Sequence, residues 1–184
     1  MKKKRRNRNI VLGVTGSIAA YKAVELMRAM QGQGWDVHVV MTRSATEFVT
    51  ELTFGTLSQN PVGVEMFGNA EEWKPEHIST ADLADVMVIA PCTANVIAKI
   101  AHGIADDLLT CTVLATESPL VIAPAMNVKM WNNAATQTNV KILKSRGVCF
   151  VEPGTGDLAC GYQGKGRMAS LPQILSVVKT CLNK

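Results

Sequence analysis

Short apolar runs recur along this chain, and each run is followed by a turn of small or polar residues and then by a segment with helical spacing. The runs predict strands at 9–14, 35–41, 86–90, 120–123 and 148–151. The periodic segments predict helices at 18–31, 44–57, 78–84, 94–102, 106–116, 134–146 and 171–182. The unbroken apolar run at 86–90 is typical of a strand buried on both faces. This alternation predicts an α/β fold: one doubly wound, Rossmann- or flavodoxin-like parallel sheet with helices on both faces.

Basic residues are concentrated at the N-terminus. The 184 residues carry a formal charge of +4, with 19 Lys and Arg against 15 Asp and Glu. Six of the basic residues lie within 1–8, so the rest of the chain has 13 basic and 15 acidic residues and a charge of −2. We expect a disordered basic tail at 1–8 and one folded domain at 9–184. The slightly acidic body argues against a nucleic-acid-binding surface.

The apolar and cysteine patterns indicate where the protein works. The apolar run after the tail has about five residues, whereas a signal peptide needs about 7–15. No run reaches the roughly 18 residues of a membrane helix. The five cysteines include no CxxC pair, which disfavours a zinc cluster or a disulfide framework. We therefore expect a cytoplasmic protein with reduced thiols, no metal, and no nucleic-acid or membrane partner.

Small polar segments follow four of the expected strands, at 15–17, 42–44, 91–95 and 124–127. In doubly wound folds, ligands bind at the carboxyl ends of the strands, where helix N-termini present free amide donors. We therefore expect these segments to line one site. The first turn, at 13–17, matches neither GxGxxG nor GxxxxGK[ST], so it is either a phosphate-binding turn or simply a tight one.

Three further features contain groups that could act on a substrate. The segment 124–131 places Asn127 before the bulky Met130 and Trp131. It is either a capped turn with core-filling side chains or a carboxamide that binds a carboxylate beneath an apolar cover. Cys160 lies in a glycine-rich segment at 158–168, which we expect to be mobile. His77, just before the helix expected at 78–84, is either a surface helix cap or a reacting group.

Together these motifs resemble those of the flavin-dependent cysteine decarboxylases, and most closely those that act in coenzyme A biosynthesis. The shared marks are Gly16-Ser17-Ile18, His77-Ile78, Pro91-Cys92-Thr93-Ala94-Asn95-Val96, the complete Pro-x-Met-Asn-x-x-Met-Trp motif from Pro124 to Trp131, and Ala159-Cys160-Gly161. They occur in the family's order, so 9–184 is identified as a flavoprotein decarboxylase domain. An eight-residue motif matched throughout makes the resemblance specific.

The resemblance implies FMN as the cofactor and a homo-oligomer, either a trimer or a dodecamer of trimers, with the flavin at subunit interfaces. The positions that would meet the FMN phosphate are Gly16, Ser17 and Ile18, with Thr42 and Ser44 beside them. The positions that would line the rest of the flavin are Thr93, Ala94, Asn95 and Ala125.

The implied activity is FMN-dependent decarboxylation of 4'-phosphopantothenoylcysteine to 4'-phosphopantetheine, through thioaldehyde and enethiolate intermediates. Of the three catalytic positions, His77 would be the general base, Asn127 would hold the substrate carboxylate, and Cys160 would protonate the enethiol carbon. The substrate would also contact Met130, Trp131, Ala159 and Gly161.

Two departures from the family pattern leave the substrate open. Tyr162 follows the Cys160 motif where relatives often carry Asp, and Ala81 and Asp82 stand where some relatives carry basic residues for the substrate phosphate. The residues that could replace those cations by charge are Lys74, Lys129, Lys165 and Arg167.

Two alternative functions remain. One is decarboxylation of a C-terminal cysteine in a peptide, and the other is a non-catalytic FMN-binding protein that regulates a partner. Many bacterial relatives are fused to the ligase that makes the small-molecule substrate. Because this sequence ends at Lys184, we expect a separate phosphopantothenoylcysteine synthetase as a partner.

Overall fold

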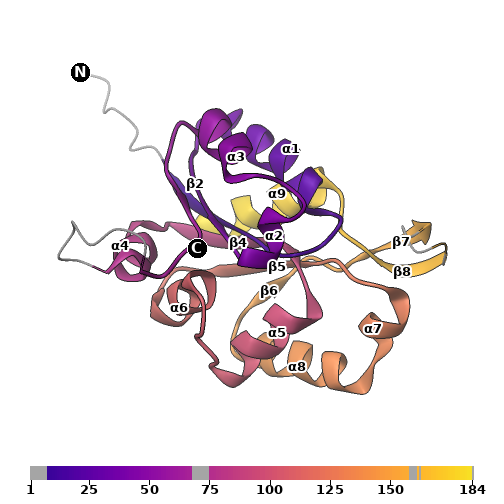
Figure 1. Ribbon diagram of the computed structural model, residues 1–184. Coiled ribbons are helices and arrows are strands. Elements are labelled where there is room, and N and C mark those ends of the chain that lie inside the picture. Colours follow the sequence, from indigo (N-terminus) through magenta and orange to yellow (C-terminus); the bar gives the residue numbers. More distant parts are fainter. Residues whose placement is uncertain (1–7, 68–74, 158–160, 162, 184) are drawn as a thin grey trace.

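A six-stranded parallel sheet forms the centre of the protein (Figure 1). The computed structural model describes residues 8–67, 75–157, 161 and 163–183. The strand order is β3-β2-β1-β4-β5-β6. The strands are β1 (Asn9–Val14), β2 (Asp36–Met41), β3 (Val62–Gly63), β4 (Val86–Cys92), β5 (Leu120–Pro124) and β6 (Cys149–Phe150). The order reverses between β1 and β4, which is the switch point where doubly wound folds bind ligands.

Helices cover both faces of this sheet, so the predicted fold class is confirmed. On one face lie α1 (Ala20–Gln31), α3 (Glu51–Ser58) and α9 (Leu171–Leu182), and on the other lie α5 (Ala94–His102), α6 (Leu108–Ala115) and α8 (Ala134–Ser145) (Figure 1). The remaining helices are α2 (Arg43–Thr46), α4 (Glu76–Leu83), which packs against α6, and α7 (Val128–Asn132). No helix within the described ranges is long and apolar enough to cross a membrane.

The side chains of β1 show why this sequence forms two layers. Ile10 and Leu12 belong to the core that includes α1 and α9, whereas Val11 belongs to the core that includes α5, α6 and α8. Successive side chains of a strand point to opposite faces of its sheet. All three side chains are completely buried, which explains why the stretch 10–14 contains no polar residue.

The helix expected at 44–57 is two helices, α2 and α3, with a break between them. Thr50 is extended (φ −76°, ψ 152°) and precedes the first residue of α3. The break lets Val49 and Phe54 both pack against the core on the α1 face. The periodicity of the apolar residues did not reveal it, because both helices bury the same side of the chain.

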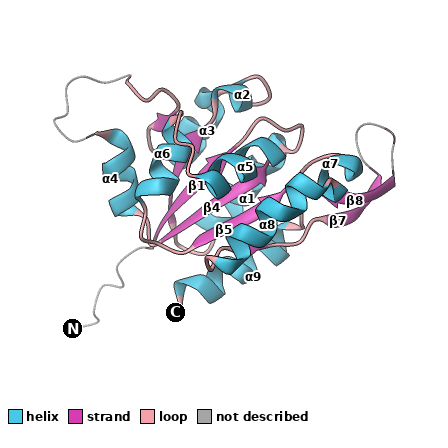
Figure 2. Cartoon of the chain, turned by 90° about the horizontal axis from the view of Figure 1, so that it is seen from below, coloured by secondary structure: helices cyan, strands magenta, loops and turns pink. Residues whose placement is uncertain are grey.

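Two strands that the sequence did not predict lie in and just before the glycine-rich segment at 158–168. β7 (Gly154–Asp157) and β8 (Gln163–Arg167) form an antiparallel two-stranded ribbon. The expectation that 148–151 contains the last strand is therefore wrong. Figure 2 shows the ribbon beside α7, beyond the edge of the main sheet.

The folded domain begins at residue 8, one residue earlier than predicted. Arg8, assigned to the disordered tail from the sequence, donates hydrogen bonds to Asp85 at 3.3 Å and to the Leu182 carbonyl at 3.4 Å. Its own carbonyl accepts from the Asp36 backbone N–H at 2.8 Å. Arg8 therefore belongs to the folded domain, and residues 1–7 lie outside the described part of the chain.

Candidate functional site

A pocket of about 690 Å³ lies beyond the carboxyl ends of β1, β4 and β5. The residues that follow these strands form much of its wall, namely Gly16, Ser17, Ile18, Thr93, Ala125, Met126 and Asn127. Helix α1 adds Tyr21 and Lys22, α7 adds Met130, and the ribbon adds Asp157, Gly166 and Arg167. Three of the four segments predicted to meet at one site therefore line this pocket.

A buried threonine joins the first two of these segments. The Thr15 hydroxyl donates to the Pro91 carbonyl at 2.8 Å and accepts from the Thr93 backbone N–H at 3.1 Å. Thr15 is fully buried, so these bonds replace the water that its hydroxyl would otherwise bind. The turn after β1 and the start of α5 are thereby held in a fixed relation. Sequence reasoning gave Thr15 no role of its own.

Gly16 brings the turn after β1 against α2. A Cβ placed on Gly16 would lie 2.5 Å from the Ser44 Cβ and 3.0 Å from the Ser44 carbonyl oxygen. The predicted neighbourhood of Gly16 and Ser44 is therefore present, although neither Ser44 nor Thr42 is among the residues that line the pocket. Glycine at this position allows a contact that a side chain would prevent.

Thr42 has a buried hydroxyl that could bind a ligand. Its side chain is buried, and its hydroxyl oxygen makes no hydrogen bond with any residue that the structure describes. Buried hydroxyls are normally paired, and leaving one unpaired costs about 1–3 kcal/mol. Its backbone N–H donates to the Val14 carbonyl at 3.0 Å, which holds Thr42 beside the turn that contains Gly16. An unpaired hydroxyl here fits an anionic group such as a flavin phosphate.

Helix α5 begins at the second segment. Thr93 caps this helix, and its side-chain oxygen accepts from the Val96 backbone N–H at 3.4 Å. Thr93 lines the pocket, whereas Ala94 and Asn95, the first two residues of the helix, do not. Of these three predicted flavin neighbours, Thr93 is therefore the one that lines the pocket.

The third segment carries the carboxamide. Asn127 caps α7, and its side-chain oxygen accepts from the Lys129 backbone N–H at 2.8 Å. This bond orients the amide at the pocket wall, and the NH₂ group is the part that can donate to a substrate carboxylate. Met130 lines the pocket and is 48% exposed, whereas Trp131 is buried and does not line it. Trp131 therefore supports the wall, and Met130 is the apolar residue that a ligand would meet.

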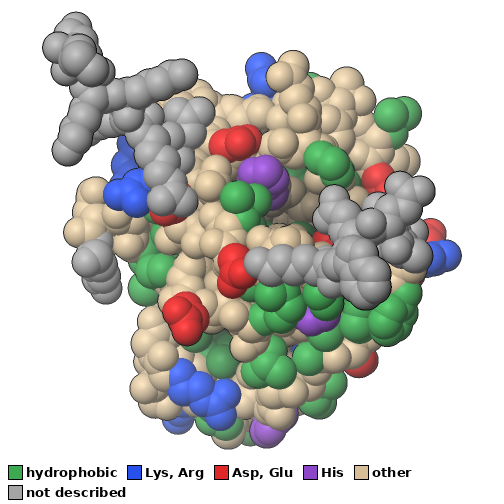
Figure 3. All heavy atoms as spheres, turned by 90° about the vertical axis from the view of Figure 1, so that its left-hand side faces the viewer, with side chains coloured by type: hydrophobic (Ala, Val, Ile, Leu, Met, Phe, Trp, Pro, Cys, Tyr) green, Lys and Arg blue, Asp and Glu red, His purple; other side chains and the backbone are tan. Residues whose placement is uncertain are grey.

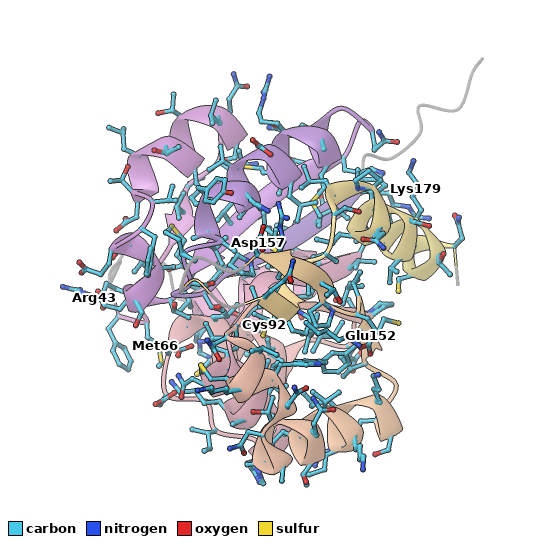
Figure 4. The ribbon with its side chains drawn as sticks, turned by 90° about the vertical axis from the view of Figure 1, so that its right-hand side faces the viewer. Arg43, Met66, Cys92, Glu152, Asp157 and Lys179 are labelled. Carbon is cyan, nitrogen blue, oxygen red and sulfur yellow. The ribbon has the colours of Figure 1, made fainter. Side chains whose placement is uncertain are left out.

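The ribbon closes the pocket on the side of α7. The Met126 backbone N–H donates to the Gly166 carbonyl at 3.0 Å, and a Cβ on Gly166 would collide with the Met126 carbonyl oxygen. This contact puts Asp157 and Arg167 on the pocket wall. Figure 4 labels Asp157 on the ribbon and Glu152 near its base. Asp157, Tyr21 and Lys22 are pocket residues that sequence reasoning missed.

Hydrogen bonds between charged side chains hold the ribbon against α8. Glu152 accepts hydrogen bonds from Lys144 at 2.7 Å and from Lys165 at 2.8 Å. These two bonds, from Lys144 first and then from Lys165, outweigh the effect of burial and lower the pKa of Glu152. The Lys165 ammonium also lies 5.8 Å from the centre of the Trp131 ring. The network ties β8 to α8 and to the residue that supports the pocket wall.

Cys92 ends β4 but does not take part in the site's chemistry. It is completely buried, and burial raises the pKa of its thiol far above the usual range. The thiol therefore stays protonated and packs as a small apolar group. Cys92, Cys111, Cys149 and Cys181 are all free thiols.

Two of the remaining predicted residues, His77 and Gly161, are described by the structure and do not line this pocket. His77 lies in the first turn of α4, whose Glu76 carboxylate is 2.7 Å from where a Cβ on Gly63 would stand. The N-terminus of α4 therefore lies over the β3 edge of the sheet, and His77 is not among the pocket residues. Gly161 is exposed and does not line the pocket, and Ala159 and Cys160 lie outside the described residues.

The face that carries α4 is shown in Figure 3. Among the described side chains visible there, Lys and Arg are scattered between acidic and apolar ones and form no continuous basic patch (Figure 3). No group of three or more His, Cys, Asp or Glu side chains gathers as metal ligands within the ranges that the structure covers.

A pocket at the switch point of a doubly wound sheet defines an α/β protein of the class that binds ligands, nucleotide cofactors among them, at this position. The chain belongs to the Flavoprotein family, whose model matches residues 1–183. The family predicted from the motifs is therefore confirmed.

Individual relatives agree with this assignment. The coenzyme A biosynthesis bifunctional protein CoaBC of Bacillus subtilis (strain 168) is 47% identical over 173 residues, which cover 94% of this chain and 43% of that protein. The chain thus spans less than half the length of the curated relatives it matches.

Solved structures match over nearly the whole chain. A PPC decarboxylase mutant complexed with pantothenoylaminoethenethiol has a TM-score of 0.86 and 32% identity, covering 97% of this chain and 100% of that one. The FMN-dependent cysteine decarboxylase SpaF has a TM-score of 0.83 and 32% identity, covering 96% and 95%.

Proposed function

We propose that this chain is an FMN-dependent decarboxylase that converts 4'-phosphopantothenoylcysteine to 4'-phosphopantetheine. The observation that carries the proposal is one pocket that combines the turn at Gly16 and Ser17 with the Asn127 carboxamide. The first is suited to a cofactor phosphate and the second to a substrate carboxylate. The similarity to CoaBC and to the PPC decarboxylase structure supports this choice of substrate.

The pocket residues fit a flavin. The turn at Gly16, Ser17 and Ile18, with the neighbouring Thr42 and Ser44, would hold the FMN phosphate, and the Thr42 hydroxyl has no partner among the described residues. Thr93 and Ala125 would line the rest of the cofactor from the pocket wall, with Ala94 and Asn95 behind them. When bound, FMN supplies the reversible oxidation of the substrate's sulfur-bearing carbon, which makes loss of CO₂ feasible.

The protein's own residues would orient the substrate and exclude water. The Asn127 NH₂ group would donate to the carboxylate without neutralising it as a cation would, so the carboxylate keeps the negative charge that passes to the substrate when neutral CO₂ leaves. Met130 would cover the reacting end, with Trp131 packed behind it. Ala159 and Gly161 would contact the substrate from the segment that joins β7 to β8.

His77 and Cys160 complete the proposed chemistry as general base and general acid. Because His77 lies over the β3 edge of the sheet, a second copy of the chain is the proposed source of the histidine that faces Asn127. Ile18, Tyr21 and Met130 are 59%, 55% and 48% exposed at the pocket, an apolar rim that a neighbouring subunit would cover. The proposed assembly is a trimer or a dodecamer of trimers. The free thiols support the proposed cytoplasmic location.

Product masses test this function against its alternatives. Purified protein with FMN is incubated with phosphopantothenoylcysteine and, separately, with a peptide that ends in cysteine. The proposal predicts a product lighter by about 44 Da from the small molecule, because CO₂ is lost and the oxidation is reversed. A product lighter by about 46 Da would indicate an enethiol. Reaction of the peptide alone, or flavin binding with no reaction, would contradict the proposal in favour of the peptidyl or the regulatory alternative.

A further inference from the structure

We infer that Arg167 determines substrate specificity by binding the terminal phosphate of the substrate, an inference that rests on the proposed function. A phosphomonoester carries a charge of about −1.5 to −2 at neutral pH and three strong acceptor oxygens. An arginine guanidinium matches such a group with several donors in one plane. A cation that binds the substrate phosphate must lie at the wall of the pocket.

The structure separates the cations that the sequence offers for this role. Lys165 is engaged with the Glu152 carboxylate at 2.8 Å and lies over the Trp131 ring. Lys129 is not among the pocket residues, and Lys74 lies outside the described ranges. Arg167 lines the pocket. Of the three candidates that the structure describes, Arg167 is the one that a bound substrate would meet.

The ribbon explains how Arg167 reaches this wall. Its neighbour Gly166 hydrogen-bonds to Met126, the residue before Asn127, so β8 is fixed against the segment that would hold the substrate carboxylate. The position of a Cβ on Gly156 in the paired strand would be 3.5 Å from the Arg167 Nη1 atom. This distance is an ordinary contact and places the guanidinium across the ribbon, beside Gly156.

The charges of the pocket suit a second phosphate, distinct from that of the cofactor. Lys22 lies on α1, close in sequence to the turn proposed for the FMN phosphate, whereas Arg167 lies on the ribbon. Asp157 is the one carboxylate among the described lining residues, so the two cations leave the wall with a net positive charge. Arg167 and Asn127 would thus hold the two charged ends of one substrate.

Direct binding tests this role without relying on turnover. The affinities of FMN-loaded protein for 4'-phosphopantetheine and for pantetheine are measured by titration calorimetry, for the wild type, Arg167→Gln, Arg167→Lys and the control Lys129→Gln. The wild type should prefer the phosphorylated compound by about tenfold or more, as expected for a charge-assisted hydrogen bond. Arg167→Gln should abolish this preference while leaving pantetheine binding unchanged. Arg167→Lys should retain part of it, and Lys129→Gln all of it.

A second arm distinguishes the substrate phosphate from that of the flavin. FMN and riboflavin are titrated into flavin-free protein. If Arg167→Gln weakens FMN binding but not riboflavin binding, and the preference for phosphopantetheine persists, the inference is overturned. It is also overturned if Arg167→Gln leaves every affinity unchanged. A wild type that binds phosphopantetheine selectively but decarboxylates nothing would refute the proposed function and leave the phosphate site standing.

Discussion

Gly166 and Met126 are joined backbone to backbone: the Met126 N–H donates to the Gly166 carbonyl at 3.0 Å, and no side chain could fit between them. Together with the Glu152 network, this junction fixes the ribbon relative to Asn127, the residue that follows Met126. The ribbon carries Arg167 on one strand and Asp157 on the other. The geometry of the pocket therefore depends on a glycine that makes no chemical contribution of its own.

The first prediction concerns this junction. Gly166→Ala places a methyl group against the Met126 carbonyl and should displace the ribbon, at a cost of about 1–3 kcal/mol in stability. We expect decarboxylase activity to fall by at least about tenfold, as for other misplaced site groups. Gly154→Ala is the matched control, because its Cβ would lie 3.9 Å from the Arg167 carbonyl oxygen, an ordinary contact. Equal effects of the two changes on activity and thermal stability would contradict this account.

The second prediction concerns Thr42, whose effects on stability and on binding should have opposite signs. Thr42→Val removes a buried hydroxyl that lacks a partner among the described residues, so the flavin-free protein should be as stable as the wild type or up to about 1 kcal/mol more stable. FMN should bind more weakly, because the phosphate loses a donor. Thermal melts of the flavin-free protein and fluorescence titration with FMN measure both effects. A destabilised protein with unchanged FMN affinity would show that the hydroxyl serves the fold instead.

The third prediction concerns Asn127. Asn127→Asp keeps an oxygen that can accept from the Lys129 N–H, so the cap of α7 and the melting temperature should be preserved. The new carboxylate would repel the substrate's carboxylate and should reduce kcat/KM by about 100-fold or more, equivalent to about 2.7 kcal/mol. Steady-state kinetics with FMN-saturated protein measure this loss. Activity within a factor of two of the wild type would exclude a carboxylate-binding role.

The fourth prediction is a pH dependence away from the pocket. Burial opposes ionisation of Asp107, but hydrogen bonds from the Thr110 N–H at 2.8 Å, from the Thr110 hydroxyl and from Lys99 outweigh it and lower the pKa of this carboxyl. A lowered pKa stabilises the fold above the unfolded value of about 3.9, and that stability is lost as the pH falls through the folded value.

Asp107→Asn should therefore lower the melting temperature at pH 7, with a gap that closes as the pH falls below about 3.9. Asn caps a helix about as well as Asp, so the variant isolates the charge. Asp106→Asn is the control, because Asp106 also pairs with Lys99 but does not cap α6. A gap between Asp107→Asn and wild type that widens in acid would contradict the assigned sign.

The sequence revealed most of the main sheet because its strands are local apolar runs. β4 and β5 were recognisable from 86–90 and 120–123, since burial on both faces leaves no polar residue in these runs. The ribbon was not, because strands as glycine-rich as Gly154–Asp157 and Gln163–Arg167 show no alternation of apolar and polar side chains. Its position depends on Met126, which is distant in sequence from β8, and no local pattern encodes such a contact.

The site residues that follow strands could be predicted from the sequence, whereas those placed by contacts between distant segments could not. Gly16, Thr93 and Asn127 follow three central strands, so parallel topology alone brings them together. Tyr21 and Lys22 were missed, although they lie four residues after Ser17 and Ile18, a spacing that puts them one helical turn further along the chain. The separation of His77 from Asn127 could not be predicted, because it depends on where α4 packs in three dimensions.

FMN binding in the pocket at Gly16 underlies all the catalytic roles proposed here. The direct measurement is the amount of FMN bound per chain, from visible absorbance and from flavin released on denaturation, for the wild type and Gly16→Ala. Because a Cβ at Gly16 would lie 2.5 Å from the Ser44 Cβ, the variant should bind at least about tenfold more weakly. We predict one FMN per chain in the wild type and little in the variant. A wild type that binds no FMN, or a variant that binds it equally well, would contradict the account.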